Sequence, residues 1–146
     1  MGGPDWTYDP AEASHRALRG IQHELGRHPI VTDVRGFPTG ELTRVVAALA
    51  TERWGADRDD AALTVRWFAG ATADAAPEFS FHYSDEASDS GWHHEPNPHV
   101  EGWGHYQEWN ATTEEYTYDS YTFGSANPTR VVWEVMSSLS AELDAD

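Results

Sequence analysis

Apolar residues recur every three to four positions in three stretches of the chain, and this spacing predicts three amphipathic helices. The first begins after Asp9, a residue type that caps helices, and ends near Gly26. The second spans about residues 39–54 and the third spans 127–143. We therefore expect two helices in the N-terminal part of the chain and one at its C-terminal end.

Between these helices the pattern changes to an alternation of apolar and polar residues, which predicts β-strands. Residues 78–84 alternate most clearly, and residues 62–68 do so in the same way. Residues 105–109 are also strand-like, whereas residues 91–104 contain two prolines and three glycines and are expected to be largely irregular. The sequence thus predicts a run of strands interrupted by one long loop.

The last expected strand, residues 115–123, is rich in aromatic residues whose parity changes along its length. Because side chains of one strand face cannot change parity without an extra residue, we expect a bulge or bend near Asp119 and Ser120.

The order of these elements predicts one α+β domain over residues 1–146. We expect a mostly antiparallel sheet of about four strands within residues 62–123, which also carry a loop rich in histidine and tryptophan. A helical portion over residues 9–54 and the C-terminal helix at 127–143 would pack on one face of that sheet.

The net charge of the chain indicates the kind of solvent in which the protein works. The chain has 25 acidic residues and nine basic ones, a formal net charge of −16, and all nine basic residues are arginine. Self-repulsion on this scale is screened in concentrated salt, where the Debye length falls to about 3 Å at 1 M. The acidic composition without lysine predicts a halophilic protein.

Further absences narrow the class of protein. The chain has no cysteine, which excludes disulfides and thiolate chemistry. No apolar run approaches the roughly 20 residues that a membrane span needs. The first residues have neither the basic start nor the apolar segment of a signal peptide, so we expect a cytoplasmic protein with no membrane partner.

Candidate chemistry is concentrated between residues 82 and 105, which contain five of the eight histidines. Aromatic residues are interleaved with them, and stacking on such rings would suit a nucleic-acid base. The candidate substrate-binding residues are Tyr83, Trp92, His93, His94, Trp103 and Tyr106. Imidazoles and carboxylates also suit a metal, but the segment has no HExxH spacing, so we assign no metal ligand and no cofactor and keep a metal-binding protein as an alternative.

Acid–base chemistry without a metal is the second interpretation. If the strands that hold Arg66 and His82 pair antiparallel, both side chains can lie on one open face of the sheet. Histidines can move protons near neutral pH, and an arginine can stabilise a charged phosphorane. This set would suit the cleavage of a phosphodiester in RNA.

The second half of the chain resembles the TumE-like family of toxin–antitoxin proteins, within the RelE-like group. The matching features are an aromatic strand ending in His82-Tyr83, a histidine- and glycine-rich stretch ending in Gly104-His105, and the segments Glu114-Glu115-Tyr116 and Tyr121-Thr122-Phe123, followed by Ser125 and an amphipathic C-terminal helix. The resemblance covers about the last 70 residues. It implies a small α+β domain, RNase activity, an antitoxin partner, and His82, His99 and His105 as catalytic residues. Arg66, which lies outside the resemblance, would bind the phosphate.

A different class of function fits the same segment. A long ordered loop rich in tryptophan and histidine also suits a non-catalytic module that docks a protein partner. The histidines could, alternatively, hold the shape of an irregular loop through hydrogen bonds. The sequence leaves these alternatives open.

Overall fold

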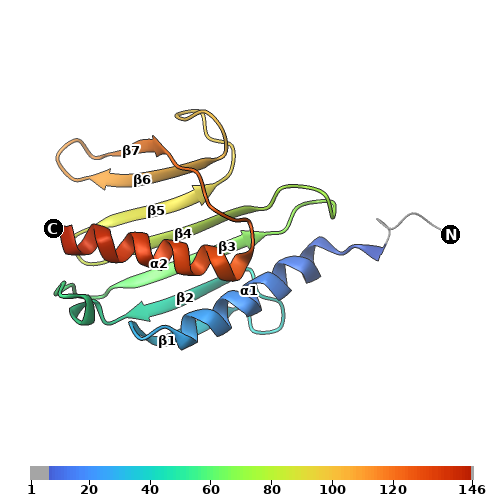
Figure 1. Cartoon of the computed structure of the whole chain (residues 1–146), viewed down its shortest axis with the longest axis horizontal. Helices are drawn as coiled ribbons and strands as arrows, with labels where there is room; N and C mark the ends of the chain where they lie inside the picture. The colour runs from blue at the N-terminus through green and yellow to red at the C-terminus, as the bar shows by residue number, and fades with distance from the viewer. Residues whose placement is uncertain (1–6, 146) are drawn as a thin grey trace.

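The computed structural model describes residues 7–145, which form two helices on one seven-stranded antiparallel sheet (Figure 1). Helix α1 (Pro10–Arg27) precedes the sheet and helix α2 (Pro128–Ala145) follows it. The strands are β1 (Val31–Phe37), β2 (Arg44–Leu49), β3 (Ala62–Phe68), β4 (Glu78–Ser84), β5 (Asp89–His94), β6 (Gly104–Asn110) and β7 (Glu115–Ser120). Each strand pairs with the next one along the chain, so the sheet is a simple meander.

Both helices begin where local capping chemistry predicts. The carboxylate of Asp9 accepts hydrogen bonds from the backbone N–H groups of Ala11 and Glu12, and Pro10 occupies the first turn. Asn127 accepts from the backbone N–H groups of residues 129 and 130 in the same way. The first and third predicted helices are therefore confirmed.

The core lies between the helices and one face of the sheet. Figure 1 shows α1 over β1 and β2 and α2 over the middle of the sheet, while β6 and β7 extend beyond both helices. The fully buried side chains alternate along the strands, and they pack against an apolar stripe of each helix. We call the opposite face of the sheet, which no helix covers within residues 7–145, the open face.

The helix predicted over residues 39–54 is wrong, because its centre is strand β2 and only Thr51–Trp54 form a short 3-10 turn. The apolar residues of this segment fit helical spacing, but Val45, Ala47 and Leu49 also alternate, and these three are the buried ones. Pairing with β1 and β3 therefore decides the structure. The α+β class is correct, whereas seven strands replace the expected four.

The long irregular loop is shorter than predicted. Residues 91–94 belong to strand β5, and the loop covers only residues 95–103 before β6. Gly91 lies within the strand, where a Cβ atom would come within 2.6 Å of His82 Nδ1 and 3.0 Å of the Phe81 carbonyl oxygen. A strand glycine here allows close approach of a neighbouring ring and does not mark a loop.

Strand β7 ends at Ser120, which is where the change of aromatic parity predicts a bend. The chain leaves the sheet there, and the backbone N–H of Tyr121 still donates to the Gly104 carbonyl oxygen at 2.9 Å. Neither described helix is long and apolar enough to cross a membrane.

Candidate functional site

Strand register brings three histidines together on the open face, although 11 and 12 residues separate them along the chain. Arg66, Ser80, His93 and His105 form one row across β3 to β6, and His82 lies in the adjacent row beside Gly91. The rings of His82 and His93 have centroids 5.8 Å apart, and those of His93 and His105 stack at 5.0 Å. We call His82, His93 and His105 the histidine row.

Two carboxylates hold members of this row. Asp89 Oδ1 bonds to Nε2 of His82 and also accepts a hydrogen bond of 2.9 Å from the hydroxyl of Tyr116. Glu95 Oε1 lies 3.0 Å from Nδ1 of His93. Burial, together with the hydrogen bond to Asp89, raises the pKa of Tyr116 to about 12, so its hydroxyl keeps its proton at neutral pH.

The row also contains two buried nitrogens without a hydrogen-bond partner among the described residues, His93 Nε2 and His105 Nδ1. Because Nδ1 of His93 faces a carboxylate, the neutral ring carries its proton there and leaves a lone pair on Nε2. Burial lowers the pKa of His93, Glu95 raises it in part, and the neighbouring imidazoles lower it further. His93 is therefore a neutral imidazole on the open face, and its Nε2 atom is buried.

His105 and His99, two of the residues expected to be catalytic, occupy different environments. His105 is fully buried, and its Nε2 lies 3.4 Å from Asn97 Nδ2 and 3.3 Å from Gln107 Oε1. His99 is exposed and stacks on Tyr118 with ring centroids 4.4 Å apart. Tyr118 in turn lies 6.1 Å from the ring of His105, so a tyrosine separates the two histidines. In this conformation His105 has no surface with which to touch a substrate.

Arg66 lies on the open face, as the alternation predicts, in the row that contains His93. Its side chain is exposed and forms no ion pair among the described residues. It lines a pocket of about 660 Å³ with Ser80, Glu78 and Glu95, and none of the histidine row borders that pocket. The structure thus brings Arg66 to the correct face but gives it no contact with the histidines.

Most candidate substrate-binding residues lie away from the histidine row. Tyr83 and Trp92 point into the core and are 1% and 2% exposed, which removes them from any accessible site. Tyr106 packs against Trp92 on the same side of the sheet, with ring centroids 4.9 Å apart. His94 stacks on Phe79 of the core, and the exposed Trp103 leans on His94. Only His93 of this set belongs to the row, because residues adjacent in a strand face opposite sides.

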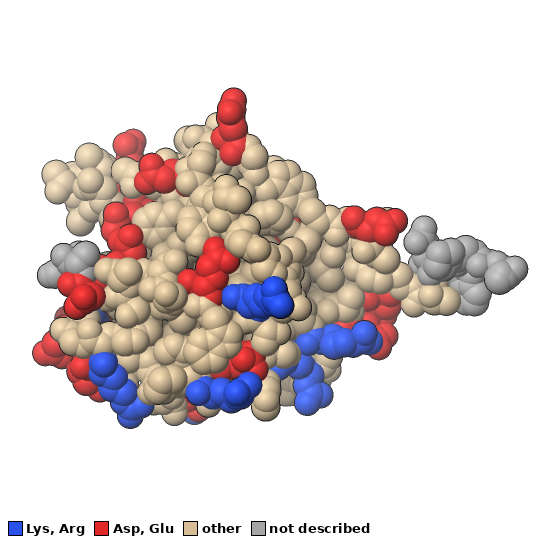
Figure 2. All heavy atoms as spheres, viewed as in Figure 1, with Lys and Arg blue, Asp and Glu red and all other residues tan. Residues whose placement is uncertain are grey.

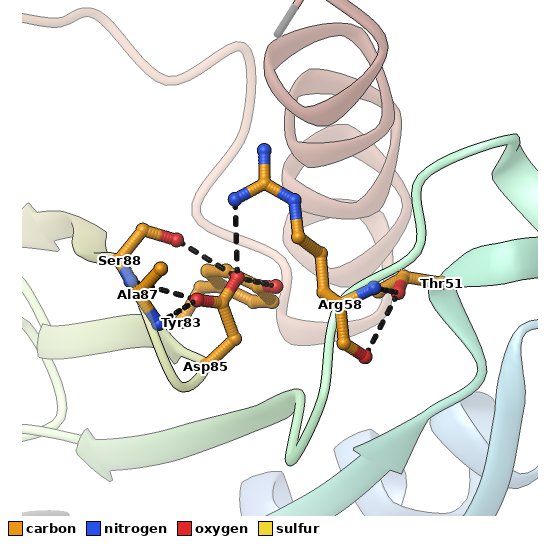
Figure 3. A network of polar contacts seen from close by, with 6 residues as sticks. All are labelled: Thr51, Arg58, Tyr83, Asp85, Ala87 and Ser88. Carbon is orange, nitrogen blue, oxygen red and sulfur yellow. Dashed lines mark hydrogen bonds and ion pairs between the residues drawn. The ribbon is translucent and has the colours of Figure 1, made fainter.

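No sequence pattern points to the polar network around Asp85, at the turn between β4 and β5 (Figure 3). The Asp85 side chain is 1% exposed and accepts hydrogen bonds from the Tyr83 hydroxyl, the Ser88 hydroxyl and the backbone N–H groups of Ala87 and Ser88. Nη1 of Arg58, from the segment before β3, lies 3.7 Å from Asp85 Oδ2. Asp85 therefore holds structure in place and is not available to a ligand.

Charge is divided unevenly between the two ends of the sheet. Residues 67–129 contain no lysine or arginine but eleven carboxylates, namely Asp74, Glu78, Asp85, Glu86, Asp89, Glu95, Glu101, Glu108, Glu114, Glu115 and Asp119. Figure 2 shows basic side chains toward the α1 side of the helix-covered face and only acidic ones over β5 to β7. The histidine row thus belongs to a segment of the chain that contains eleven carboxylates and no lysine or arginine.

These features limit the chemistry of the site. No group of three or more potential ligands among residues 7–145 is arranged to hold a metal ion. What remains is a set of contacting rings and two imidazole–carboxylate pairs, in a segment of the chain that is rich in carboxylates. No family model, curated protein or solved structure matches the chain in sequence or in fold.

Proposed function

We propose that the protein is a non-catalytic binding module whose open sheet face docks a basic protein partner. The carrying observation is that the open face of β4 to β7 presents aromatic and imidazole rings and belongs to a segment, residues 67–129, that has eleven carboxylates and no lysine or arginine; Arg66 of β3 lies at the border of this area. Opposite charges steer association and select partners, and the few residues that dominate the binding energy of protein interfaces are enriched in tryptophan, tyrosine and arginine.

Several exposed or half-buried rings on β6 and β7 are suited to such an interface. Trp109 on β6 is 40% exposed and packs edge-on against Tyr116 of β7, with ring centroids 5.2 Å apart. Tyr118 on the same strand stacks with His99. These rings are held by their neighbours, so little side-chain entropy is lost when a partner covers them.

The proposal is tested by selecting binders from a random-peptide display library on the immobilised protein. Selected peptides should be enriched in arginine and lysine, and their affinity should fall about tenfold or more in Trp109→Ala and in Tyr118→Ala. Trp133→Ala is the matched control, because Trp133 is 41% exposed but lies on helix α2. Selection of acidic peptides, or binding lost only in Trp133→Ala, would overturn the proposal.

A metal-independent RNase, as the TumE-like resemblance implies, is the second candidate. The His82–Asp89 and His93–Glu95 pairs favour it, since a carboxylate that orients an imidazole is a common arrangement in general acid–base catalysis. The charge of the surround opposes it, because binding of a phosphate backbone depends on lysine and arginine. RNA cleavage by the purified protein that is lost in His82→Gln would replace the first proposal with this one.

A further inference from the structure

A pocket of about 660 Å³ opens where the first turn of α1 meets the ends of β3 and β4. Its size lies in the range of small-molecule sites, which extends over about 300–1,000 Å³. Two hydrogen bonds join the start of the helix to the segment after β3: Tyr8 donates to the Gly70 carbonyl oxygen at 2.9 Å, and the Ala69 backbone N–H donates to Ser14 Oγ at 2.9 Å. The pocket is therefore preformed.

Three aromatic side chains, Trp67, Phe68 and Phe79, contribute to its wall. Trp67 and Phe79 pair across β3 and β4 and stack with ring centroids 4.3 Å apart and an angle of 5° between the planes; they are 5% and 4% exposed, so only a small part of each ring is accessible. Phe68 adds a ring that is 44% exposed, and Leu42 lines the pocket nearby. Such a wall binds the apolar body of a ligand, and ring faces also attract cations.

The charged groups that line the pocket are four carboxylates, Asp9, Glu41, Glu78 and Glu95, and one cation, Arg66. Asp9 caps helix α1 and so offsets the positive end of its dipole, while Glu95 bonds to His93. Glu41 and Glu78 have no hydrogen bond or ion pair within residues 7–145. Two carboxylates are therefore available beside these rings, against one cation, Arg66, that has no ion pair in the described part of the chain.

We infer that this pocket binds a small organic cation, in which an ammonium group is attached to an aromatic or aliphatic body. The body would lie mainly against Phe68 and the small accessible parts of Trp67 and Phe79, and the ammonium group would face Glu41 and Glu78. This inference does not rest on the proposed protein partner, because the probes are tested on the free protein. The pocket shares Arg66 and Ser80 with the open face but is lined by no member of the histidine row.

Three matched probes test it: 2-(2-naphthyl)ethylammonium, the neutral 2-(2-naphthyl)ethanol and the anionic 2-naphthylacetate. Binding is measured by calorimetry, and contact with the pocket is followed through the indole N–H signal of Trp67 in NMR spectra. The ammonium probe should bind about tenfold or more tightly than the anion, with the alcohol between them. Equal affinities of the three probes, or no binding, would overturn the inference.

Charge variants distinguish binding of the ammonium probe in the pocket from its general attraction to a negatively charged protein. Glu41→Gln combined with Glu78→Gln should weaken the ammonium probe several-fold and leave the alcohol unchanged. Glu108→Gln combined with Glu115→Gln makes the same change of charge near the turn between β6 and β7 and should have little effect. Phe68→Ala should weaken both the ammonium probe and the alcohol. If the two double variants act equally, the ammonium probe responds only to net charge and the pocket is not its site.

Discussion

The carboxylate of Asp85 shows how one side chain fixes a connection between strands. Burial alone would raise its pKa, but hydrogen bonds from Tyr83, Ser88 and the backbone N–H of Ala87 outweigh that effect and lower the pKa below its ordinary value. A carboxyl with a lowered pKa stabilises the fold above its unfolded pKa, and this contribution is lost as the pH falls through the folded value.

We therefore expect Asp85→Asn to destabilise the protein by about 3 kcal/mol, because the amide replaces a buried acceptor with a donor and leaves partners unpaired. The measurement is the free energy of unfolding in urea. Asp74→Asn serves as the control, since Asp74 is exposed in the loop after β3 and should change the free energy by less than about 0.5 kcal/mol. An equal effect of the two substitutions would show that the network in Figure 3 contributes no stability.

At the scale of elements, β2 and β5 explain why the sheet is larger than predicted. The apolar residues of β2 fit a helix as well as a strand, and a single segment cannot choose between the two periods when it is only six residues long. Strand β5 contains Gly91, which predicts a loop when read locally. Its true role depends on His82 of the neighbouring strand, whose ring occupies the space of a missing Cβ.

The packing of β4, β5 and β6 around His93 also predicts that the free energy of unfolding depends on pH. His93 faces His82 on one side, His105 on the other and Glu95 within reach of its ring, and its pKa is lowered mainly by burial. Because the pKa of His93 is lower in the folded protein, the unfolded protein binds this proton more readily. The free energy of unfolding is therefore unaffected by this group above the unfolded pKa, near 6.5, and decreases as the pH falls from there toward the folded pKa.

We accordingly expect the free energy of unfolding to decrease between pH 7 and pH 5, and His93→Gln to reduce this dependence. Burial between tryptophans lowers the pKa of His28 as well, so the substitution should not abolish it. His99→Gln, at an exposed site, should leave the slope unchanged. A pH profile that is identical in wild type and His93→Gln would contradict the assignment.

At the scale of the whole molecule, the net charge of −16 acts on stability through self-repulsion. We expect the midpoint of thermal unfolding to rise as NaCl increases from 0.05 to 0.5 M (values chosen for the experiment), because the Debye length then falls from roughly 14 Å to about 4 Å. The combined variant Glu114→Gln and Glu115→Gln, which removes two charges from the turn between β6 and β7, should show a smaller rise. A midpoint that is independent of salt would argue against the halophilic interpretation, which stays a prediction.

Local chemistry was enough to predict both helices with their caps and the alternation of β3 and β4, because capping bonds and side-chain parity involve residues within about four positions of one another. It was also enough to place Arg66 and His82 on one face, given antiparallel pairing of their strands. The open face and the concentration of histidines could therefore be expected from the sequence.

Only the tertiary structure decided where these histidines lie and how far each one is buried. The register of β4, β5 and β6 brings His82, His93 and His105 together in two adjacent rows, buries His105, and turns His94 to the opposite face. It also places Arg66 in a pocket formed with the start of α1, which is about fifty residues earlier in the chain. The physical reason is that register and burial depend on contacts between distant segments, and the composition of one segment carries no record of its neighbours.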